Sequence, residues 1–211
     1  MAERSGLSVL RDAMGSLNAT GARGFLLGAL VLAIIVPELL GGDALRLAWR
    51  FDRKAIEAGE GWRLFSAHFV HLDRPHALAN AAGAVLIWAL VGTAFGAGRW
   101  LQVVAASLAG TTLGLWFLEP GLGWYVGASG FLHGLLVAGA LRNALAADPL
   151  SRIVLGVVIV KLCWEQLVGP MSTAGEGVNV VVGAHLYGAL GGAVSALADR
   201  ARSGPRTSPT S

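Results

Sequence analysis

The chain has 211 residues, of which 55% are hydrophobic and 14% charged, with a formal net charge of +3. A soluble domain of this size needs more charge to cover its surface, so the composition excludes an ordinary soluble enzyme and indicates a membrane protein. The basic residues are scattered at the edges of apolar segments, which argues against a nucleic-acid partner. A single cysteine, Cys163, excludes an internal disulfide and a cysteine metal site.

Six apolar segments are predicted to be membrane-spanning helices. In chain order they cover residues 24–40, 76–96, 100–118, 129–145, 153–168 and 180–197. The expected domain organisation is a cytoplasmic segment (1–23), a helical domain (24–198) with an outer loop (41–75), and a disordered polar tail (199–211). No cleavable signal peptide is expected near the start. The predicted fold class is an all-α polytopic membrane protein.

The distribution of arginine predicts that both ends of the chain lie in the cytoplasm. With the start of the chain inside, the loops after the third and fifth segments lie outside, and neither contains Lys or Arg. The first outer loop departs from the positive-inside rule, because it contains basic residues, which alternate with acidic ones. We expect this loop to fold as an amphipathic structure at the membrane interface. The arginines assigned to the cytoplasmic side are Arg4, Arg11, Arg23, Arg99, Arg142, Arg152, Arg200, Arg202 and Arg206.

The fourth segment is unusually short. Its apolar part, from Ser129 to Leu141, covers about 20 Å of a hydrocarbon core of about 30 Å. With Arg142 at the cytoplasmic end, Ser129 lies below the outer membrane surface. The glycine-rich approach EPGLGWYVGASG suits a re-entrant loop, which is tolerated at that depth only where it lines a cavity or is buried. The sequence therefore predicts Ser129 at the floor of a water-filled depression.

A histidine in the sixth segment can reach this serine. His185 lies one residue away from the face formed by Gly188 and Gly192, which have the spacing that lets helices approach closely. If the partner is the fourth helix, His185 reaches Ser129 and forms a nucleophile with its general base. The alternative is a structural histidine bonded to a backbone carbonyl.

The second segment begins with further polar residues at the same depth. Asp73 is a plausible helix N-cap, and His76 and Asn80 share one face of the helix. Their N–H groups could hold a developing oxyanion, or they could belong to a capping network at the helix start. Three helices then bring their polar groups to one site. No carboxylate is expected to orient His185, so the predicted machinery is a dyad with Ser129.

The motifs that carry these residues resemble those of the rhomboid intramembrane serine proteases. GEGWRLFSAHFVHLDRPHALAN (59–80) resembles the first-loop Trp-Arg motif and the second-helix His-x-x-x-Asn motif. GASG and AHLYGALGG resemble the motifs of the fourth and sixth helices. The resemblance implies a six-transmembrane-helix rhomboid-like bundle with a short fourth helix. It implies that Ser129 is the nucleophile and His185 the base, with His76, Asn80 and the Ser129 N–H as the oxyanion hole.

The same resemblance implies supporting residues around the catalytic ones. Gly127 and Gly130 belong to the nucleophile motif. Trp62 and Arg63 are expected to hold the first loop in the membrane interface. His71 is interpreted mainly as loop structure, with a place beside the water-filled depression.

His133, one turn after Ser129, departs from the common pattern. Many rhomboids carry an aromatic residue there, stacked on the catalytic histidine, so His133 is expected to pack beside His185 and orient it. SGFLHG and KLCWEQLVG are similar to the rhombosortase subfamily. That resemblance implies a bacterial inner-membrane enzyme acting on C-terminal Gly-Gly-type sorting signals followed by an apolar helix and a basic tail.

Lys161 and Glu165, four residues apart in the fifth segment, are predicted to form an ion pair. The pair either fixes this helix against its neighbours or contacts a substrate gate or basic substrate tail. The loop GPMSTAGEGVN before the sixth segment has the composition of a mobile lid.

The residues and these resemblances together imply an intramembrane serine endopeptidase of the bacterial inner membrane, with its site opening to the periplasmic side. Its expected partners are membrane-anchored protein substrates and the lipid bilayer, and no cofactor or metal is implied. The alternatives are a rhomboid protease of general specificity and a non-proteolytic rhomboid-like protein that binds membrane clients. A transporter or channel is disfavoured, because the inner halves of the second, fourth and sixth segments are almost wholly apolar. The oligomeric state stays open.

Overall fold

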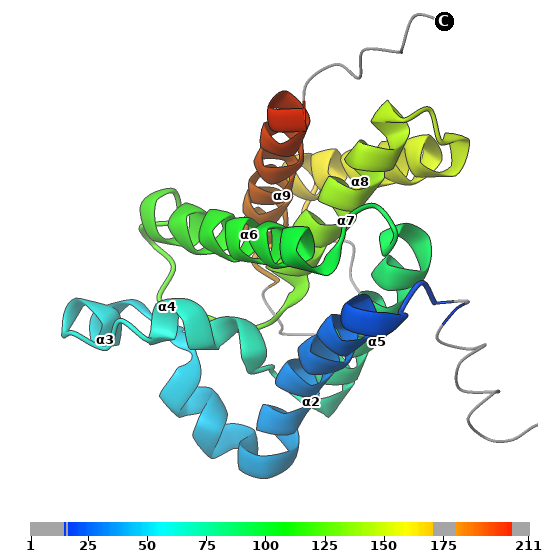
Figure 1. Ribbon diagram of the computed structural model, residues 1–211. Helices are drawn as coiled ribbons and strands as arrows, with labels where there is room; N and C mark the ends of the chain where they lie inside the picture. Colours follow the sequence, from blue (N-terminus) through cyan, green and yellow to red (C-terminus); the bar gives the residue numbers. More distant parts are fainter. Residues whose placement is uncertain (1–14, 16, 171–179, 204–211) are drawn as a thin grey trace, which may run out of the picture.

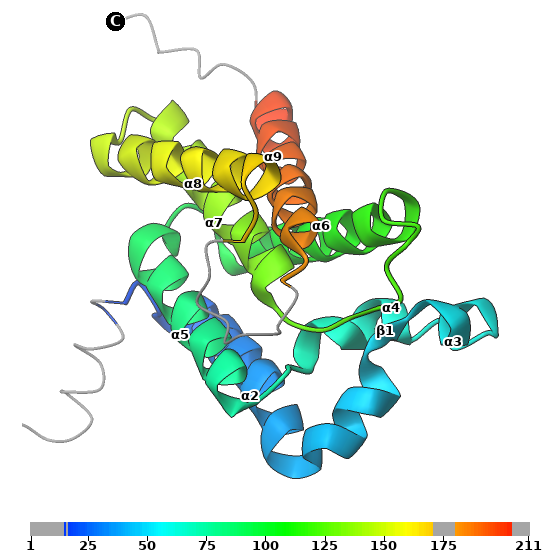
Figure 2. The same ribbon diagram turned by 180° about the vertical axis from the view of Figure 1, so that it is seen from behind.

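The computed structural model describes residues 15, 17–170 and 180–203 of the chain, and it is a bundle of long helices, seen from two opposite sides in Figure 1 and Figure 2. The long helices are α2 (Gly21–Trp49), α5 (Arg74–Val91), α6 (Ala97–Phe117), α7 (Ser129–Leu145), α8 (Pro149–Leu167) and α9 (Val182–Ser203). The short elements are β1 (Phe51–Asp52), α3 (Arg53–Glu57), α4 (Arg63–Ser66), η1 (Ala67–Phe69) and β2 (Trp124–Tyr125). The predicted all-α class is confirmed, with one short ladder as its β-structure in the described part of the chain.

The long helices coincide with the six predicted segments, and α7 has the predicted bounds. The largest difference is α2, which runs past the predicted end at residue 40 and continues to Trp49 through a kink at Gly42 (φ 45°, ψ −132°). Among the described helices, α2 and α6 are both long and apolar enough to cross a membrane. α7 has only 17 residues. The number of six membrane crossings therefore stays a prediction.

Glycine brings α6, α7 and α9 into backbone contact. A Cβ built on Gly192 of α9 would lie 2.6 Å from the carbonyl carbon of Gly134 in α7. A Cβ built on Gly110 of α6 would lie 2.7 Å from the carbonyl oxygen of Tyr187 in α9. No side chain fits at these positions, so the three helices approach as closely as their backbones allow. This contact places the start of α9 beside the start of α7.

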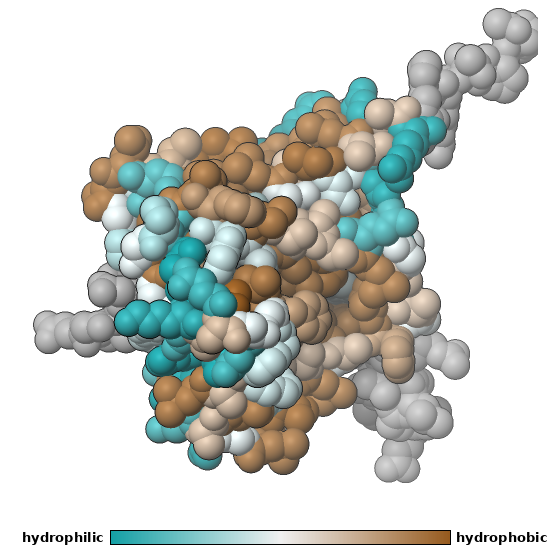
Figure 3. Space-filling model, turned by 90° about the vertical axis from the view of Figure 1, so that its left-hand side faces the viewer, coloured by the Kyte–Doolittle hydropathy of each residue, from teal (hydrophilic) through white to brown (hydrophobic). Residues whose placement is uncertain are grey.

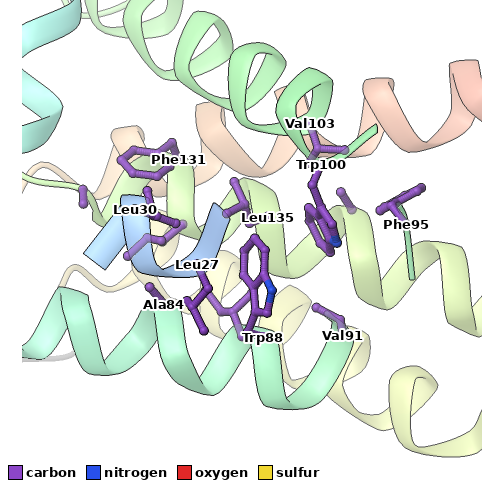
Figure 4. Packing of buried hydrophobic residues seen from close by; sticks show 14 of the residues in the cluster. Leu27, Leu30, Ala84, Trp88, Val91, Phe95, Trp100, Val103, Phe131 and Leu135 are labelled. Atoms are coloured by element: carbon purple, nitrogen blue, oxygen red, sulfur yellow. The ribbon is translucent and has the colours of Figure 1, made fainter. Parts of the chain in front are cut away.

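The largest apolar cluster joins α2, α5, α6 and α7 (Figure 4). The fully buried rings of Trp88 and Trp100 lie 5.1 Å apart, and the indole N–H of Trp100 donates to the carbonyl of Gly92 at 3.0 Å. Phe95 meets Trp100 edge-on. The cluster holds α5, which carries His76, against α7.

The loop between α2 and α5 is folded, as predicted. Arg63 donates to the carbonyls of Leu47 and Arg50 at the end of α2, at 2.9 and 3.1 Å. In β1, Phe51 pairs antiparallel with Tyr125 of β2. The loop is thereby tied both to the end of α2 and to the segment that leads into α7.

The outward faces of the helices carry many large apolar side chains, and Figure 3 shows such residues over much of one side of the molecule. Phe25, Leu40 and Leu167 are each more than 80% exposed. Contiguous apolar surface of this extent is rare on soluble monomers and fits contact with lipid.

Candidate active site

The turn before α7 requires glycine at position 127. Gly127 has φ +119°, and a Cβ built on it would lie 3.0 Å from Cε1 of His76. Its N–H donates to the carbonyl of Ala67 at 3.0 Å, and its carbonyl accepts from the Tyr125 hydroxyl at 2.8 Å. This geometry places the segment from Gly127 to Ser129, which leads into α7, beside α5 and η1.

The hydroxyl of Ser129 meets the imidazole of His185. Oγ lies 3.0 Å from Nε2, and the histidine is buried. A Cβ built on Gly188, one turn along α9, would lie 2.5 Å from the carbonyl carbon of Gly130. Gly130 of the GASG motif and Gly188 of the AHLYGALGG motif therefore allow α7 and α9 to approach closely enough for His185 to reach Ser129. The pair has the arrangement of a nucleophile hydrogen-bonded to a general base.

A carboxylate also contacts this histidine, although the sequence predicted none beside His185. Oε2 of Glu165 lies 2.9 Å from Nδ1 of His185, and Nζ of Lys161 lies 2.6 Å from Oε1 of the same carboxylate. The Lys161–Glu165 pair expected from the sequence is present. The spacing of Lys161 and Glu165 within α8 predicts their ion pair. It does not predict the contact with His185, because that contact depends on how α8 packs against α9.

His133 stacks on His185 with ring centroids 4.2 Å apart and planes at 22°. Its Nδ1 lies 2.7 Å from the carbonyl oxygen of Ser129, to which it donates a hydrogen bond. The ring therefore lies beside His185, where the sequence predicted it. It makes no hydrogen bond to the Ser129 hydroxyl among the interactions described for these residues.

His76 and Asn80 lie at the start of α5. Asp73 caps the helix, since its Oδ1 accepts from the backbone N–H of His76 at 2.8 Å. The His76 ring lies against Gly127, close to Ser129 in the chain. The buried Asn80 donates one amide hydrogen to the carbonyl of His76 at 3.0 Å, which leaves the second for another acceptor. The predicted capping network is thus present, and both side chains keep polar atoms that an oxyanion could use.

The remaining predicted residues lie around this cluster. His71 is fully buried, and its ring meets that of His76 edge-on at 5.1 Å. Burial and the neighbouring His76 lower the pKa of His71 to about 3, so its ring is neutral at physiological pH. Trp62 is 56% exposed and free to meet the membrane interface, whereas Arg63 is engaged by the protein itself.

Among the described residues, no group of three or more His, Cys, Asp or Glu side chains is arranged to hold a metal ion. Residues 171–179 of the predicted lid lie outside the described residues.

The chain is similar to known proteins over most of its length. A family model of the rhomboid domain matches residues 58–202, a range that contains the whole cluster described above. The chain is 32% identical over 193 residues to the rhomboid protease GlpG of Salmonella choleraesuis, which covers 85% of this chain and 63% of that protein. It is 31% identical, with the same coverage, to the rhomboid proteases GlpG of Salmonella newport and Salmonella typhimurium. The chain thus spans less than two thirds of the length of these curated relatives.

Proposed function

This chain belongs to the rhomboid family, and from that premise we propose that it is an intramembrane serine endopeptidase. The observation that carries the proposal is the 3.0 Å contact between Oγ of Ser129 and Nε2 of His185 at the end of a helical bundle. A non-proteolytic protein that binds membrane clients would not require a serine hydroxyl that is hydrogen-bonded to a general base. The Ser129–His185 contact therefore favours the enzyme.

The proposed reaction is acyl transfer through Ser129. Oγ attacks the scissile carbonyl while its proton moves to Nε2 of His185, and the same proton then passes to the leaving amine. Water hydrolyses the acyl-enzyme, with His185 again taking the proton. The oxyanion is held by the N–H of Ser129 together with His76 and Asn80. Since Ser129 is the first residue of α7, its N–H points out of the helix start, where negative charge is stabilised.

The proposed substrates are membrane-anchored proteins, cut near the outer face of the bacterial inner membrane. Within this class we assign the chain to the rhombosortases, which act before a C-terminal apolar helix and basic tail. His133 in place of the usual aromatic residue and the segment KLCWEQLVG support this narrower assignment. A rhomboid protease of general specificity is the alternative.

Two matched substrates test the proposal. One carries a Gly-Gly sorting signal, an apolar helix and a basic tail, and the other has the two glycines replaced by leucines. We expect the purified protein to cut the first and not the second, and Ser129→Ala to cut neither. Equal cleavage of both substrates would show general specificity. Cleavage by Ser129→Ala equal to that of the wild type would overturn the serine mechanism.

A further inference from the structure

We propose that Glu165 is a positioning residue for His185, so that the site works as a Ser129–His185–Glu165 triad with Lys161 as the counter-ion of the carboxylate. The proposal rests on the protease function proposed above and deepens it. The two oxygens of the carboxylate have separate partners: Oε1 accepts from Nζ of Lys161 at 2.6 Å, and Oε2 lies 2.9 Å from Nδ1 of His185.

These contacts determine which ring nitrogen of His185 carries the proton. An ionised carboxylate only accepts hydrogen bonds, so Nδ1 must donate to Oε2 of Glu165. Nε2 is then the unprotonated nitrogen, and it faces Oγ of Ser129 at 3.0 Å. This is the tautomer that a general base for Ser129 requires. Without a partner at Nδ1, the ring could carry its proton on either nitrogen.

The orientation of the ion pair differs from that of a purely structural pair. The side chain of Glu165 is 3% exposed, whereas that of Lys161 is 31% exposed. The lysine therefore extends toward the surface of α8, while the carboxylate points inward to α9. A pair that served only to neutralise two charges near the end of a membrane helix could extend both ends to the polar interface, where both charges would keep their solvation. The inward carboxylate is explained by the histidine that it contacts.

The charges balance through the reaction. At rest, Lys161 is positive, Glu165 is negative and His185 is neutral. When Oγ of Ser129 attacks, its proton moves to Nε2, the imidazolium keeps its other proton on Nδ1, and Glu165 stays ionised. The new positive charge lies between the carboxylate and the oxyanion. The ring of His133 covers one face of the His185 ring, with the two centroids 4.2 Å apart.

The first variant to measure is Glu165→Gln. Lys161 has only donors, so it retains the amide oxygen, and the amide NH₂ is then turned toward Nδ1 of His185. That contact moves the ring proton to Nε2, where it blocks the acceptance of the Ser129 proton. We expect kcat, and the rate at which a fluorophosphonate labels Ser129, to fall by about 10²–10⁴-fold, with KM changed by less than about threefold.

The double variant Glu165→Gln/Lys161→Met separates positioning from structure. Without Lys161, the amide is free to turn its oxygen to Nδ1–H, so we expect labelling about tenfold faster than in Glu165→Gln. If the residues had only a structural role, removing both would not restore any rate. The matched control is Glu119→Gln, since Glu119 also bonds α9, accepting from the Tyr187 hydroxyl at 2.8 Å. Its labelling rate should stay at the wild-type value.

A measurement on the wild type keeps the proposal testable if a variant fails to fold. ¹⁵N spectra of histidine-labelled protein should show His185 protonated at Nδ1 and unprotonated at Nε2. The opposite tautomer would overturn the triad, and so would labelling of Glu165→Gln at the wild-type rate; in both cases the serine protease function would stand. Failure of the fluorophosphonate to label wild-type Ser129 would overturn the protease function itself, and the triad with it.

Discussion

Two histidines lie next to Ser129, and their contacts give them different roles. His185 meets the hydroxyl through Nε2, while His133 bonds only the Ser129 carbonyl and stacks on His185. A base must reach the proton that it removes, and the ring of His185 lies within hydrogen-bond distance of the Ser129 hydroxyl. We expect His133 to limit the rotation of the His185 ring by stacking on it, a role that another flat ring can also fill.

We therefore expect His133→Phe to retain measurable activity and His185→Phe to have none. Phenylalanine can stack on His185 but cannot accept a proton from Ser129. The measurement is the initial rate of substrate cleavage at matched membrane abundance. A reversed ranking would mean that His133 is the base.

Oxyanion binding by Asn80 and His76 is expected to act on the transition state rather than on substrate affinity. Asn80→Ala and His76→Ala should each lower kcat by about a hundredfold or more. Because the carbonyl oxygen gains charge only during attack, KM should change little. Steady-state kinetics with one substrate separates the two constants. A raised KM with unchanged kcat would identify the residue as a substrate-binding or structural group.

The sequence was most informative about residues whose neighbours are set by helical spacing. Ser129 and His133 share a face by a four-residue spacing, and the glycines after His185 predict a close helix contact, so these three residues could be brought together beforehand. Glu165 could not, although its spacing from Lys161 predicted their ion pair. An apolar helix such as α8 has weak sidedness, so its neighbour is decided by packing rather than by its own pattern.

At the scale of elements, the contact of α7 with α9 positions the whole site. Gly192 lies on that contact, with the backbone of Gly134 directly opposite. Gly156 of α8 is exposed, and a Cβ built on it meets nothing within 4 Å. The two glycines therefore form a matched pair for the same substitution.

Gly192→Ala is expected to destabilise the protein by about 1–3 kcal/mol, because the methyl group forces the two backbones apart. It should also lower activity, since His185 lies on the displaced helix. Gly156→Ala should leave the free energy of unfolding unchanged or slightly raised. Unfolding in mixed detergent micelles measures both. Equal stability of the two variants would show that α7 and α9 tolerate separation.

At the scale of the molecule, the polar groups separate to opposite ends of the bundle. Ser129, His76 and His185 lie near the starts of their helices. At the other end, Asp199 of α9 pairs with Arg99 of α6 at 3.1 Å and with Arg142 of α7 at 3.5 Å. Arginine-rich ends favour the cytoplasm, so the proposed orientation turns the site toward the periplasm.

This polarity predicts the behaviour of reporter fusions. Alkaline phosphatase fused after residue 203 should be inactive, because it folds only in the periplasm, and a fluorescent protein at the same place should fluoresce. Phosphatase inserted between α6 and β2 should be active. An active phosphatase at the C-terminal position would reverse the proposed topology.

The helical architecture could be predicted because long apolar segments alternate with polar loops in the sequence. The kink of α2 at Gly42 and its extension to Trp49 could not. The end of the extension contacts Arg63, which follows it in the chain and bonds the carbonyls of Leu47 and of the C-cap residue Arg50. The short β1–β2 ladder likewise joins segments far apart in sequence, and no local pattern marks such a pairing.

The hydrogen bond from His185 to Glu165 joins two helices, so its length depends on how far apart α8 and α9 lie. The bond is 2.9 Å long, and lengthening by about 0.6 Å takes a hydrogen bond out of its effective range. Because α8 and α9 carry its two ends, any force that moves them apart by that small amount releases the base. Bilayer thickness and lateral pressure act on the tilt and spacing of helices. We therefore expect the turnover rate to depend on the acyl-chain length of the surrounding lipid, even though no lipid touches the reacting atoms.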